Sequence, residues 1–463
     1  MRELLKKLFR EIESFYGDKE FNIPDKLSPG NVKQKLDPYD FNNERPLPEL
    51  FDEVVDLVKE GTLDVTHPSY FGLFNPSVTL ESIVADALVA LYNPQLAVWE
   101  HAPMPIGMEQ QVLSFIGSYL FSEEDFFAHF TTGGSEANMT GVLAALASGI
   151  DSFTSEGLAG TPAPPVFYLS EHAHHSFEKI TKSVGLGMQA VRRIPGDSQY
   201  RMDMGILENR LKADQDQGYR PFLVVGTAGT TSYGTIDPLK SIARFCRRHD
   251  LWFHVDAAWG GAAVMSDRLK PHMMGIEQAD SVTIDAHKWF SVGMGAGMFF
   301  TRHPNAVKDM FSVDADYVPE SNRERLHQPY LTTLQWSRRF IGLKLFMTLA
   351  SSGVEGVTRR IEHQTEMGNY LRESLRSKGW EIVNDTPLPL VCFTHEKLKE
   401  QLHSTSKILD EIHKEGRYWI SDVNAGGGNR AFRACITSFR TREEHIDAMV
   451  DDLTGKIAQE YSP

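Results

Sequence analysis

Short apolar runs alternate with helical or polar segments through the middle of the chain. The apolar runs are PVFYLS at 165–170, PFLVVGTAGTT at 221–231, LWFHVDAAWGG at 251–261, SVTIDAHK at 281–288 and GAGMFFTR at 295–302. Helical patterns such as ILENRLKADQ and LKSIARFCRRHD separate most of them. Strands that alternate with helices predict a mostly parallel sheet with helices on both faces. We therefore expect an α/β domain here, spanning about residues 75–345.

The pattern of apolar and polar residues at the two ends of the chain differs from that of the middle part. Residues 1–60 are predicted to be helical, with a polar, Pro-containing break at 37–48. The α/β domain is predicted to begin with helices at 79–92 and 105–120. The C-terminal part is predicted to contain a long helix at 353–378, strands near 380–383, 390–394 and 432–437, and a terminal helix from 442. We interpret residues 1–74 as an N-terminal helical segment and residues 346–463 as a smaller C-terminal α+β domain.

The first helix of the N-terminal segment is amphipathic. Its apolar positions recur at helical spacing, at Leu4, Leu5, Leu8, Phe9, Ile12 and Phe15. Such a stripe packs on another surface. The pattern is compatible with packing on the same subunit or on a partner subunit, and it does not choose between them.

Composition excludes several classes of protein. The 463 residues include 47 basic and 62 acidic side chains, a net charge of −15, which repels polyanions and disfavours nucleic acid as a ligand. Cys246, Cys392 and Cys435 are too widely spaced for a disulfide framework or a metal site, and they suit a reducing compartment. We see no secretory leader and no apolar run approaching 18 residues, so we expect a cytoplasmic protein without a membrane span.

An acid and a lysine each follow a predicted buried strand. Asp256 ends LWFHVD, and Lys288 follows SVTIDAH. Taken singly, Asp256 could cap a helix and Lys288 could reach solvent. Taken together at one sheet edge, they suit a pyridoxal 5′-phosphate (PLP) site, where a lysine amine binds the aldehyde and a carboxylate keeps the pyridine nitrogen protonated.

Such a cofactor also needs a phosphate site, and TTGGSEAN at 131–138 is a candidate. Gly134 and Ser135 start a predicted helix, whose first N–H groups and dipole favour an anion. Thr230 or Thr231 could add a hydroxyl, and His287 could reach the phosphate. The alternatives are a plain strand–turn–helix connection, threonines bonded to their own turn, and a core histidine.

Three histidines follow the strand at 165–170. His172, His174 and His175 lie in SEHAHHSFEK. A flat imidazole there could stack on the pyridine ring. A zinc site is the alternative, but this spacing, with no cysteine or carboxylate pattern nearby, is a poor zinc signal, and we expect no metal.

The motifs HVDAAWGGAAV and DSVTIDAHKW resemble those of the group II PLP-dependent amino acid decarboxylases. The resemblance runs from HPSYFG at 67–72 to FRACITSFRTREEHID at 432–447. It implies the aspartate aminotransferase-like fold (fold type I), with a mostly parallel seven-stranded sheet and a smaller C-terminal α+β domain. It also implies a homodimer whose active site lies at the subunit interface.

The same resemblance implies roles for individual residues. Lys288 would form the Schiff base, Asp256 would hold the pyridine nitrogen, and His174 and Ala258 would lie on the two faces of the ring. Asp285 stands where the family usually has asparagine beside the phosphate, so we expect its carboxylate to point away or to be bridged.

A polar loop at 311–330 corresponds to the mobile loop that closes over the substrate in this family. Tyr317 matches its tyrosine proton donor, and a tyrosine there favours decarboxylation over oxidative deamination. Arg433 matches an arginine that holds the substrate carboxylate in glutamate-type members. An ion pair within the small domain is the alternative for this arginine.

The substrate pocket is the least constrained part of the prediction. Tyr70, Phe71 and Phe74 match the aromatic-lined pocket mouth, although all three could be ordinary core. Leu73 and Phe74 stand where glutamate-type members have a glutamine, which favours an aromatic or largely apolar substrate. The alternatives are an acidic or small polar amino acid (glutamate, aspartate, cysteine sulfinate or diaminobutyrate), and an aldehyde synthase or transaminase-like reaction.

Overall fold

The computed structural model describes residues 2–17, 21, 23–24, 27–122, 125–313, 327–399, 404–426 and 429–460. Most of the predicted mobile loop at 311–330, including Tyr317, lies outside the described residues.

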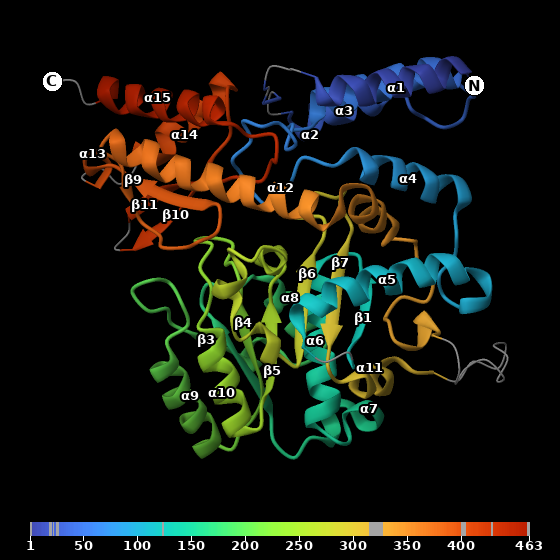
Figure 1. The fold of residues 1–463 in the computed structure, drawn as a ribbon, viewed down its shortest axis with the longest axis vertical. Helices are drawn as coiled ribbons and strands as arrows, with labels where there is room; N and C mark the ends of the chain where they lie inside the picture. Colours follow the sequence, from blue (N-terminus) through green and yellow to red (C-terminus); the bar gives the residue numbers. More distant parts are fainter. Residues whose placement is uncertain are drawn as a thin grey trace.

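A seven-stranded sheet forms the centre of the molecule (Figure 1), in the order β1-β7-β6-β5-β4-β2-β3. The strands are β1 Phe127–Thr131, β2 Pro165–Ser170, β3 Val191–Ile194, β4 Arg220–Thr227, β5 Trp252–Asp256, β6 Ser281–Asp285 and β7 Gly297–Thr301. Strands β3, β2, β4, β5 and β6 pair in parallel, and β7 pairs antiparallel with both β6 and β1. The predicted mostly parallel sheet is confirmed.

Alternate residues of each strand face two separate cores. In β2, Val166 and Tyr168 belong to one apolar cluster, and Phe167 and Leu169 belong to another. The first cluster contains residues of the helices α5 Pro103–Leu120, α9 Met204–Asp216 and α10 Leu239–His249, and the second contains residues of α6 Gly134–Gly149, α8 Ser176–Ser183 and α11 Pro304–Phe311. Because both faces are covered, every residue of β2, β5 and β6 is buried.

A second, four-stranded antiparallel sheet lies beyond one edge of the first (Figure 1), in the order β10-β11-β9-β8. Its strands are β8 Glu381–Ile382, β9 Leu390–Thr394, β10 Ser421–Gly426 and β11 Asn429–Cys435. Residues of the helices α12 Leu343–Ser377, α14 Ser404–Glu415 and α15 Glu443–Glu460 share its core. Gly353 interrupts α12 with a φ of 64°. The domain boundaries at 74/75 and 345/346 stay predictions.

The N-terminal helices lie at the same end of the molecule as the second sheet (Figure 1). The remaining helices of four or more residues are α1 Arg2–Tyr16, α2 Pro29–Leu36, α3 Leu47–Gly61, α4 Leu80–Tyr92, α7 Phe153–Glu156 and α13 Glu396–Lys399. The expected polar break between helices is confirmed at 37–46. No residue of α1 or α3 is buried within this chain, so the predicted apolar stripe has exposed members such as Leu5 and Phe9.

The topology brings five strand ends together. Strands β2, β4, β5 and β6 run parallel, and β1 has the same direction as β6 because both are antiparallel to β7. Their carboxyl ends therefore lie at one edge of the sheet, where ligands of open α/β sheets bind.

Candidate active site

A cavity of about 350 Å³ opens at this edge of the sheet. It is lined by Phe74, Thr132, Gly133, Gly134, Ser135, Glu136, Asn138, His174, Thr227, Gly229, Thr231, Asp256, Ala258, Trp259, Asp285, His287, Lys288 and Met294. Most of the residues singled out from the sequence are therefore brought together by the fold.

Asp256 is buried at the end of β5, and two amides satisfy its carboxylate. Oδ2 accepts a hydrogen bond from Asn138 Nδ2 at 2.9 Å, and Oδ1 accepts one from the backbone N–H of Ala258 at 3.1 Å. A buried carboxylate without a cation is stable only when hydrogen-bond donors surround it. Lys288 does not contact this carboxylate and has a different partner.

That partner is Asp285, at the end of β6. Lys288 Nζ lies 3.0 Å from Asp285 Oδ2, and the Lys288 side chain is 22% exposed while that of Asp285 is 2% exposed. The ammonium also lies 5.7 Å from the ring centroid of Phe74. Asp285 Oδ1 is buried, and no described residue gives it a hydrogen bond. The carboxylate thus has a free acceptor atom inside the cavity wall.

The start of α6 is an uncapped helix end. The N-cap residue Gly133 gives no side-chain hydrogen bond to the first turn. A Cβ on Gly134 would lie 2.7 Å from Asp285 Oδ2, so glycine here leaves room for the Asp285 carboxylate. An uncapped helix start with bare backbone binds anions.

His287 lies beside this helix start. Its Nδ1 accepts a hydrogen bond from the Ala296 N–H at 3.2 Å, so the neutral ring carries its proton on Nε2. Nε2 lies 3.7 Å from Asp285 Oδ2. Burial is the largest cause that lowers the pKa of His287, ahead of the opposing effect of Asp285. A neutral His287 can donate one hydrogen bond to an anion.

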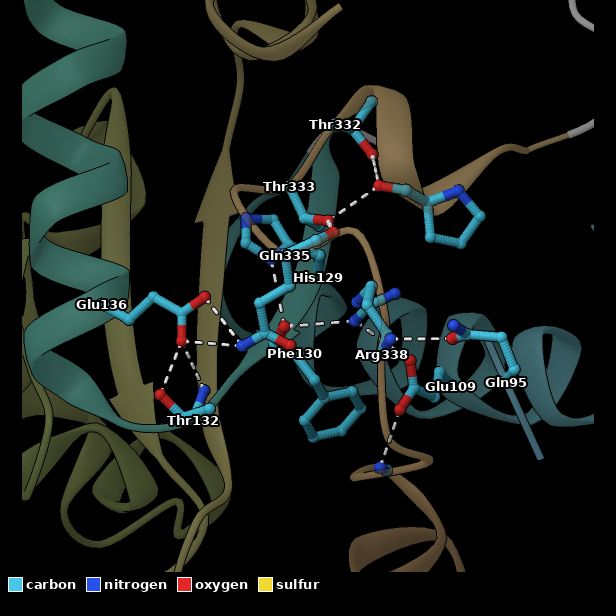
Figure 2. Close-up of polar contacts among 12 residues, drawn as sticks. Gln95, Glu109, His129, Phe130, Thr132, Glu136, Thr332, Thr333, Gln335 and Arg338 are labelled. Carbon is cyan, nitrogen blue, oxygen red and sulfur yellow. Dashed lines mark hydrogen bonds and ion pairs between the residues drawn. The ribbon is translucent and has the colours of Figure 1, made fainter. Parts of the chain in front are cut away.

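Glu136 and Gln335 connect the cavity wall to the segment after the undescribed loop (Figure 2). Gln335 Nε2 donates to both carboxylate oxygens of Glu136 at 2.9 Å, and Glu136 Oε2 also accepts from the N–H and hydroxyl of Thr132. The same view shows Arg338 between Glu109 and the carbonyl oxygen of Phe130. The contact with Glu136 ties Gln335 to the cavity wall.

Of the three clustered histidines, only His174 lines the cavity. Its ring is exposed to solvent at the mouth, and Nδ1 accepts a hydrogen bond from the Ser176 N–H at 3.2 Å. Desolvation by the surrounding protein is the largest cause that lowers its pKa, and Lys288 adds to it. His172 instead packs edge-on against Tyr200 and Tyr233.

Four of the proposed residues do not line the cavity, namely Thr230, Tyr70, Phe71 and Arg433. Thr230 is buried, with its hydroxyl 2.9 Å from that of Thr235, and Thr231 lines the cavity in its stead. Tyr70 stacks on Trp419, and Phe71 belongs to the core of the second sheet. Backbone hydrogen bonds explain this, because the Phe71 N–H donates to the Trp419 carbonyl and makes the segment an extension of that sheet. Only Phe74 of the three aromatics reaches the cavity.

Arg433 projects from β11 toward the same region. Its Nε donates to the Thr231 carbonyl at 3.0 Å and its Nη1 to the Gly72 carbonyl at 2.7 Å. Its guanidinium carbon lies 5.4 Å from the Phe74 ring centroid. Nη2 is buried, and within the described residues it has neither a hydrogen bond nor a carboxylate partner. The alternative of an ion pair within the small domain is not seen in the described residues.

These residues fit PLP. The uncapped glycine start of α6 suits the phosphate, Lys288 Nζ suits the aldehyde, and the Asp256 carboxylate suits the pyridine nitrogen. The unpaired Oδ1 of Asp285 beside the helix start disfavours a phosphate dianion.

Comparison with known proteins decides the family. Residues 29–396 match the family model described as the pyridoxal-dependent decarboxylase conserved domain. The chain belongs to this decarboxylase family. The enzyme is therefore a PLP-dependent carboxy-lyase that acts on an amino acid, and the expected family, cofactor and reaction class are confirmed.

Named relatives extend over nearly the whole decarboxylase. The acidic amino acid decarboxylase GADL1 of Xenopus tropicalis is 27% identical over 442 residues, covering 92% of this chain and 86% of that protein. The cysteine sulfinic acid decarboxylase of Mus musculus is 30% identical over 443 residues, covering 92% and 89%. The crystal structure of Oryza sativa TDC with PLP and tryptamine superposes with a TM-score of 0.92 at 22% identity, covering 99% and 97%, which confirms the expected fold type.

Sequence reasoning missed several cavity residues of the decarboxylase. Asn138 lies one helical turn after Gly134, so it faces the same side of α6, and a polar residue in the apolar stretch ANMTGVLAALA was an available signal. Trp259 follows Ala258 directly and stacks on Phe74 with ring centroids 4.4 Å apart.

Two further structural findings bear on the predictions. Within the described residues, three or more His, Cys, Asp or Glu side chains nowhere gather in a way that could hold a metal ion. No helix in the described part of the chain is long and apolar enough to span a membrane.

Proposed function

We propose that this decarboxylase converts an L-amino acid with an acidic side chain into the corresponding amine and CO2. The observation that carries the proposal is that Lys288, Asp256 and the uncapped start of α6 line one cavity. The choice of an acidic substrate rests on Arg433 and on the substrates for which the relatives are named.

PLP supplies an aldehyde and an electron-withdrawing ring that accepts the electron pair released when CO2 leaves. Lys288 would hold the cofactor through its aldehyde. Asp256 keeps the pyridine nitrogen protonated, which makes the ring a better electron acceptor. His174 and Ala258 hold the two faces of the ring.

The phosphate is bound at the start of α6. Gly134 and Ser135 contribute backbone N–H groups, and the Nε2–H of His287 contributes a side-chain donor. Thr231 lines the same cavity, whereas the Thr230 hydroxyl lies 2.9 Å from that of Thr235. Asp285 keeps Lys288 in place while its own second oxygen limits the affinity for the phosphate.

Arg433 binds a carboxylate of the substrate. Its unpaired Nη2 is buried beside Phe74, and a buried guanidinium donor without an acceptor costs about 1–3 kcal/mol. An acidic group that enters the cavity removes this cost. Tyr317, which lies outside the described residues, is proposed as the donor that returns a proton to Cα, and closure of the loop at 311–330 excludes water.

Relatives named for acidic amino acids and for cysteine sulfinic acid favour the acidic alternative over the aromatic substrate that Leu73 and Phe74 suggested. Leu73 is 48% exposed and does not line the cavity. The Phe74 ring lies near both Lys288 and Arg433, so its face contacts two cations. Neither these relatives nor the residues that line the cavity therefore support a preference for an aromatic substrate.

We also propose a cytoplasmic homodimer. Exposed apolar side chains on α1 and α3, such as Phe9 and Val58, supply a surface for a partner subunit. The active site would then lie at the interface, as in the family that the sequence resembles.

The proposal is tested by measuring CO2 release from the purified, PLP-loaded enzyme with a panel of amino acids. Aspartate, glutamate and cysteine sulfinate form the acidic arm, and tryptophan, tyrosine, dihydroxyphenylalanine and diaminobutyrate form the other arm. We expect turnover in the acidic arm, and none with Lys288→Ala. Faster turnover of an aromatic amino acid, or turnover by Lys288→Ala, would refute the proposal.

A further inference from the structure

A continuous chain of hydrogen bonds runs from Asp256 and Asn138, which line the cavity, to three residues that do not line it. It links residues of β5, β6 and α6, namely Trp252, Ser281, His254, Asn138 and Asp256. The donor–acceptor distances are 2.8 Å from Trp252 Nε1 to Ser281 Oγ, 2.8 Å from Ser281 Oγ to His254 Nδ1, 3.0 Å from His254 Nε2 to Asn138 Oδ1 and 2.9 Å from Asn138 Nδ2 to Asp256 Oδ2. All five side chains are buried.

The sheet register builds this chain. In the parallel pairing of β5 with β6, His254 lies opposite Ser281 and Asp256 lies opposite Thr283. His254 and Asp256 are two residues apart on one strand, so both side chains point to the face covered by α6. Gly141 of α6 makes room for the imidazole, because a Cβ there would lie 2.7 Å from two of its ring atoms.

The groups at the two ends of the hydrogen-bond chain determine which atom donates in every bond between them. The Trp252 indole can only donate, and an ionised Asp256 can only accept. Ser281 therefore accepts from Trp252 and gives its own proton to His254 Nδ1. His254 then carries its ring proton on Nε2, donates to Asn138 Oδ1, and leaves the Asn138 amide group to donate to Asp256.

His254 is neutral in this arrangement. Burial lowers its pKa from 6.5 to about 4, against an opposing effect of Asp256. The groups that face the ring are Asn138 on α6, Ser281 and Thr283 on β6, and Phe177 on α8, and none of them carries a charge. The acceptor role of Nδ1 is thus available at neutral pH.

We propose that His254 is a positioning residue for Asp256: with Ser281 and Asn138 it holds the carboxylate toward the pyridine nitrogen and keeps that nitrogen protonated. Hydrogen bonds aligned in one direction polarise each other and strengthen the last bond of the chain. That bond fixes Oδ2, the Ala258 N–H fixes Oδ1, and the carboxylate lines the cavity in this orientation. The inference rests on the role proposed above for Asp256.

The first test uses the cofactor-free enzyme and needs no turnover. In protein labelled with ¹⁵N-histidine, the chain requires that His254 carries its proton on Nε2 at pH 7.5. Comparison with the His254→Phe variant identifies the signal. A proton on Nδ1, or a doubly protonated ring at this pH, would overturn the proposal.

The second test reads the pyridine nitrogen directly. The enzyme is loaded with ¹⁵N-labelled PLP, and the chemical shift of the ring nitrogen is compared between the wild type, His254→Phe and Thr283→Val. The Thr283 hydroxyl lies 3.5 Å from His254 Nε2 outside the chain, so Thr283→Val is the matched control for loss of a neighbouring hydroxyl.

We expect His254→Phe to move the ring nitrogen toward the unprotonated shift and to lower kcat on the order of ten- to a hundredfold, as removal of an orienting outer partner does elsewhere, with KM changed less. Thr283→Val keeps the wild-type shift and kcat. An unchanged nitrogen shift and kcat in His254→Phe would overturn the proposal.

Two further variants keep the outcome decisive. If His254→Phe does not fold, Ser281→Ala and Ser281→Thr take its place, because only Ser281→Thr keeps a hydroxyl. Equal nitrogen shifts and equal kcat in these two variants would count against the hydrogen-bond chain. If Asp256→Asn leaves the nitrogen shift unchanged, the role proposed for Asp256 fails. If Asp256→Asn changes the nitrogen chemical shift but the His254 and Ser281 variants do not, only the positioning role of His254 fails.

Discussion

Lys288 Nζ and Asp285 Oδ2 lie 3.0 Å apart, so the amine that would bind the cofactor is paired with a carboxylate at the phosphate end of the cavity. Asp285 also lies against Gly134, at the uncapped start of α6. The resemblance led us to expect that this carboxylate would point away from the phosphate or be bridged. Lys288 bridges one oxygen, and the other is left without a partner in the described residues.

Asp285→Asn should therefore bind PLP more tightly. Removing a negative charge a few ångströms from a phosphate dianion favours binding by at least about 1 kcal/mol even in a well-screened site, which corresponds to about fivefold or more in Kd. Titration of cofactor-free protein with PLP, followed by absorbance, measures the change. Asp267→Asn, which removes an exposed carboxylate, is the control; weaker binding by Asp285→Asn would show that the carboxylate assists the phosphate site.

Arg433→Lys should raise KM for an acidic substrate about tenfold or more while kcat falls less. Lysine keeps the positive charge but cannot bond the Thr231 and Gly72 carbonyls and a substrate carboxylate with one planar group. Steady-state kinetics on the best acidic substrate check this. An unchanged KM would place Arg433 outside the substrate site and leave it a purely structural residue.

Phe71 and Phe74 should respond differently to truncation. Phe71→Ala removes a fully buried ring from the core of the second sheet and should lower the free energy of unfolding by about 3–5 kcal/mol with little change in KM. Phe74→Ala alters the cavity wall and should change KM several-fold with a smaller loss of stability. Denaturant unfolding and kinetics on both variants separate the two roles; a larger KM change in Phe71→Ala would contradict them.

The free energy of unfolding should fall as the pH decreases from about 6.5 toward 3. Burial and the nearby Arg338 lower the pKa of His129 from 6.5 to about 3, with His327 also facing it, so the unfolded chain binds a proton in this range that the folded protein does not. A single histidine of this kind makes the free energy of unfolding decline by about 1.4 kcal/mol per pH unit in this range. Its contribution to stability is fully present only above about pH 6.5. Figure 2 shows His129 beside Phe130 in this buried cluster.

His129→Phe should make this pH dependence shallower, because the ring then has no proton to bind. Its aromatic neighbours Phe127 and Phe299 accept an apolar ring. Denaturant unfolding at several pH values is the measurement. His272→Asn, at an exposed histidine, should leave the slope unchanged, and an equal effect of both variants would contradict the assignment.

Most strands were predictable because their burial on both faces makes them continuous apolar runs. The strands β3 and β10 were missed for the opposite reason. VRRI in β3 has only two fully buried positions, and SDVNAG in β10 is mostly polar with one buried valine. Edge strands and half-exposed strands depend on a neighbour for their backbone hydrogen bonds, and a single sequence does not reveal that neighbour.

The candidate active site also combines features that the sequence predicted with features that it did not. Asp256, Lys288, Gly134 and His174 each follow a strand or start a helix, and strand ends of a parallel sheet meet at one edge, so sequence order was enough to predict that they gather. The partner of each group was not predictable. Lys288 pairs with Asp285 rather than with Asp256, and Tyr70 and Phe71 turn into the second sheet while Phe74 faces the cavity.

By itself, the sequence determined the α/β class, the PLP motifs and the set of side chains at the active edge, because these depend on local periodicity and on the spacing of motifs along the chain. Only the tertiary structure decided which atoms meet. Asn138, His254 and Ser281 lie on three different elements, and their alignment with Asp256 follows from the register of β5 on β6 and the position of α6 above them. Register and packing arise from contacts between distant residues, and for that reason the hydrogen-bond chain could not be seen in the sequence.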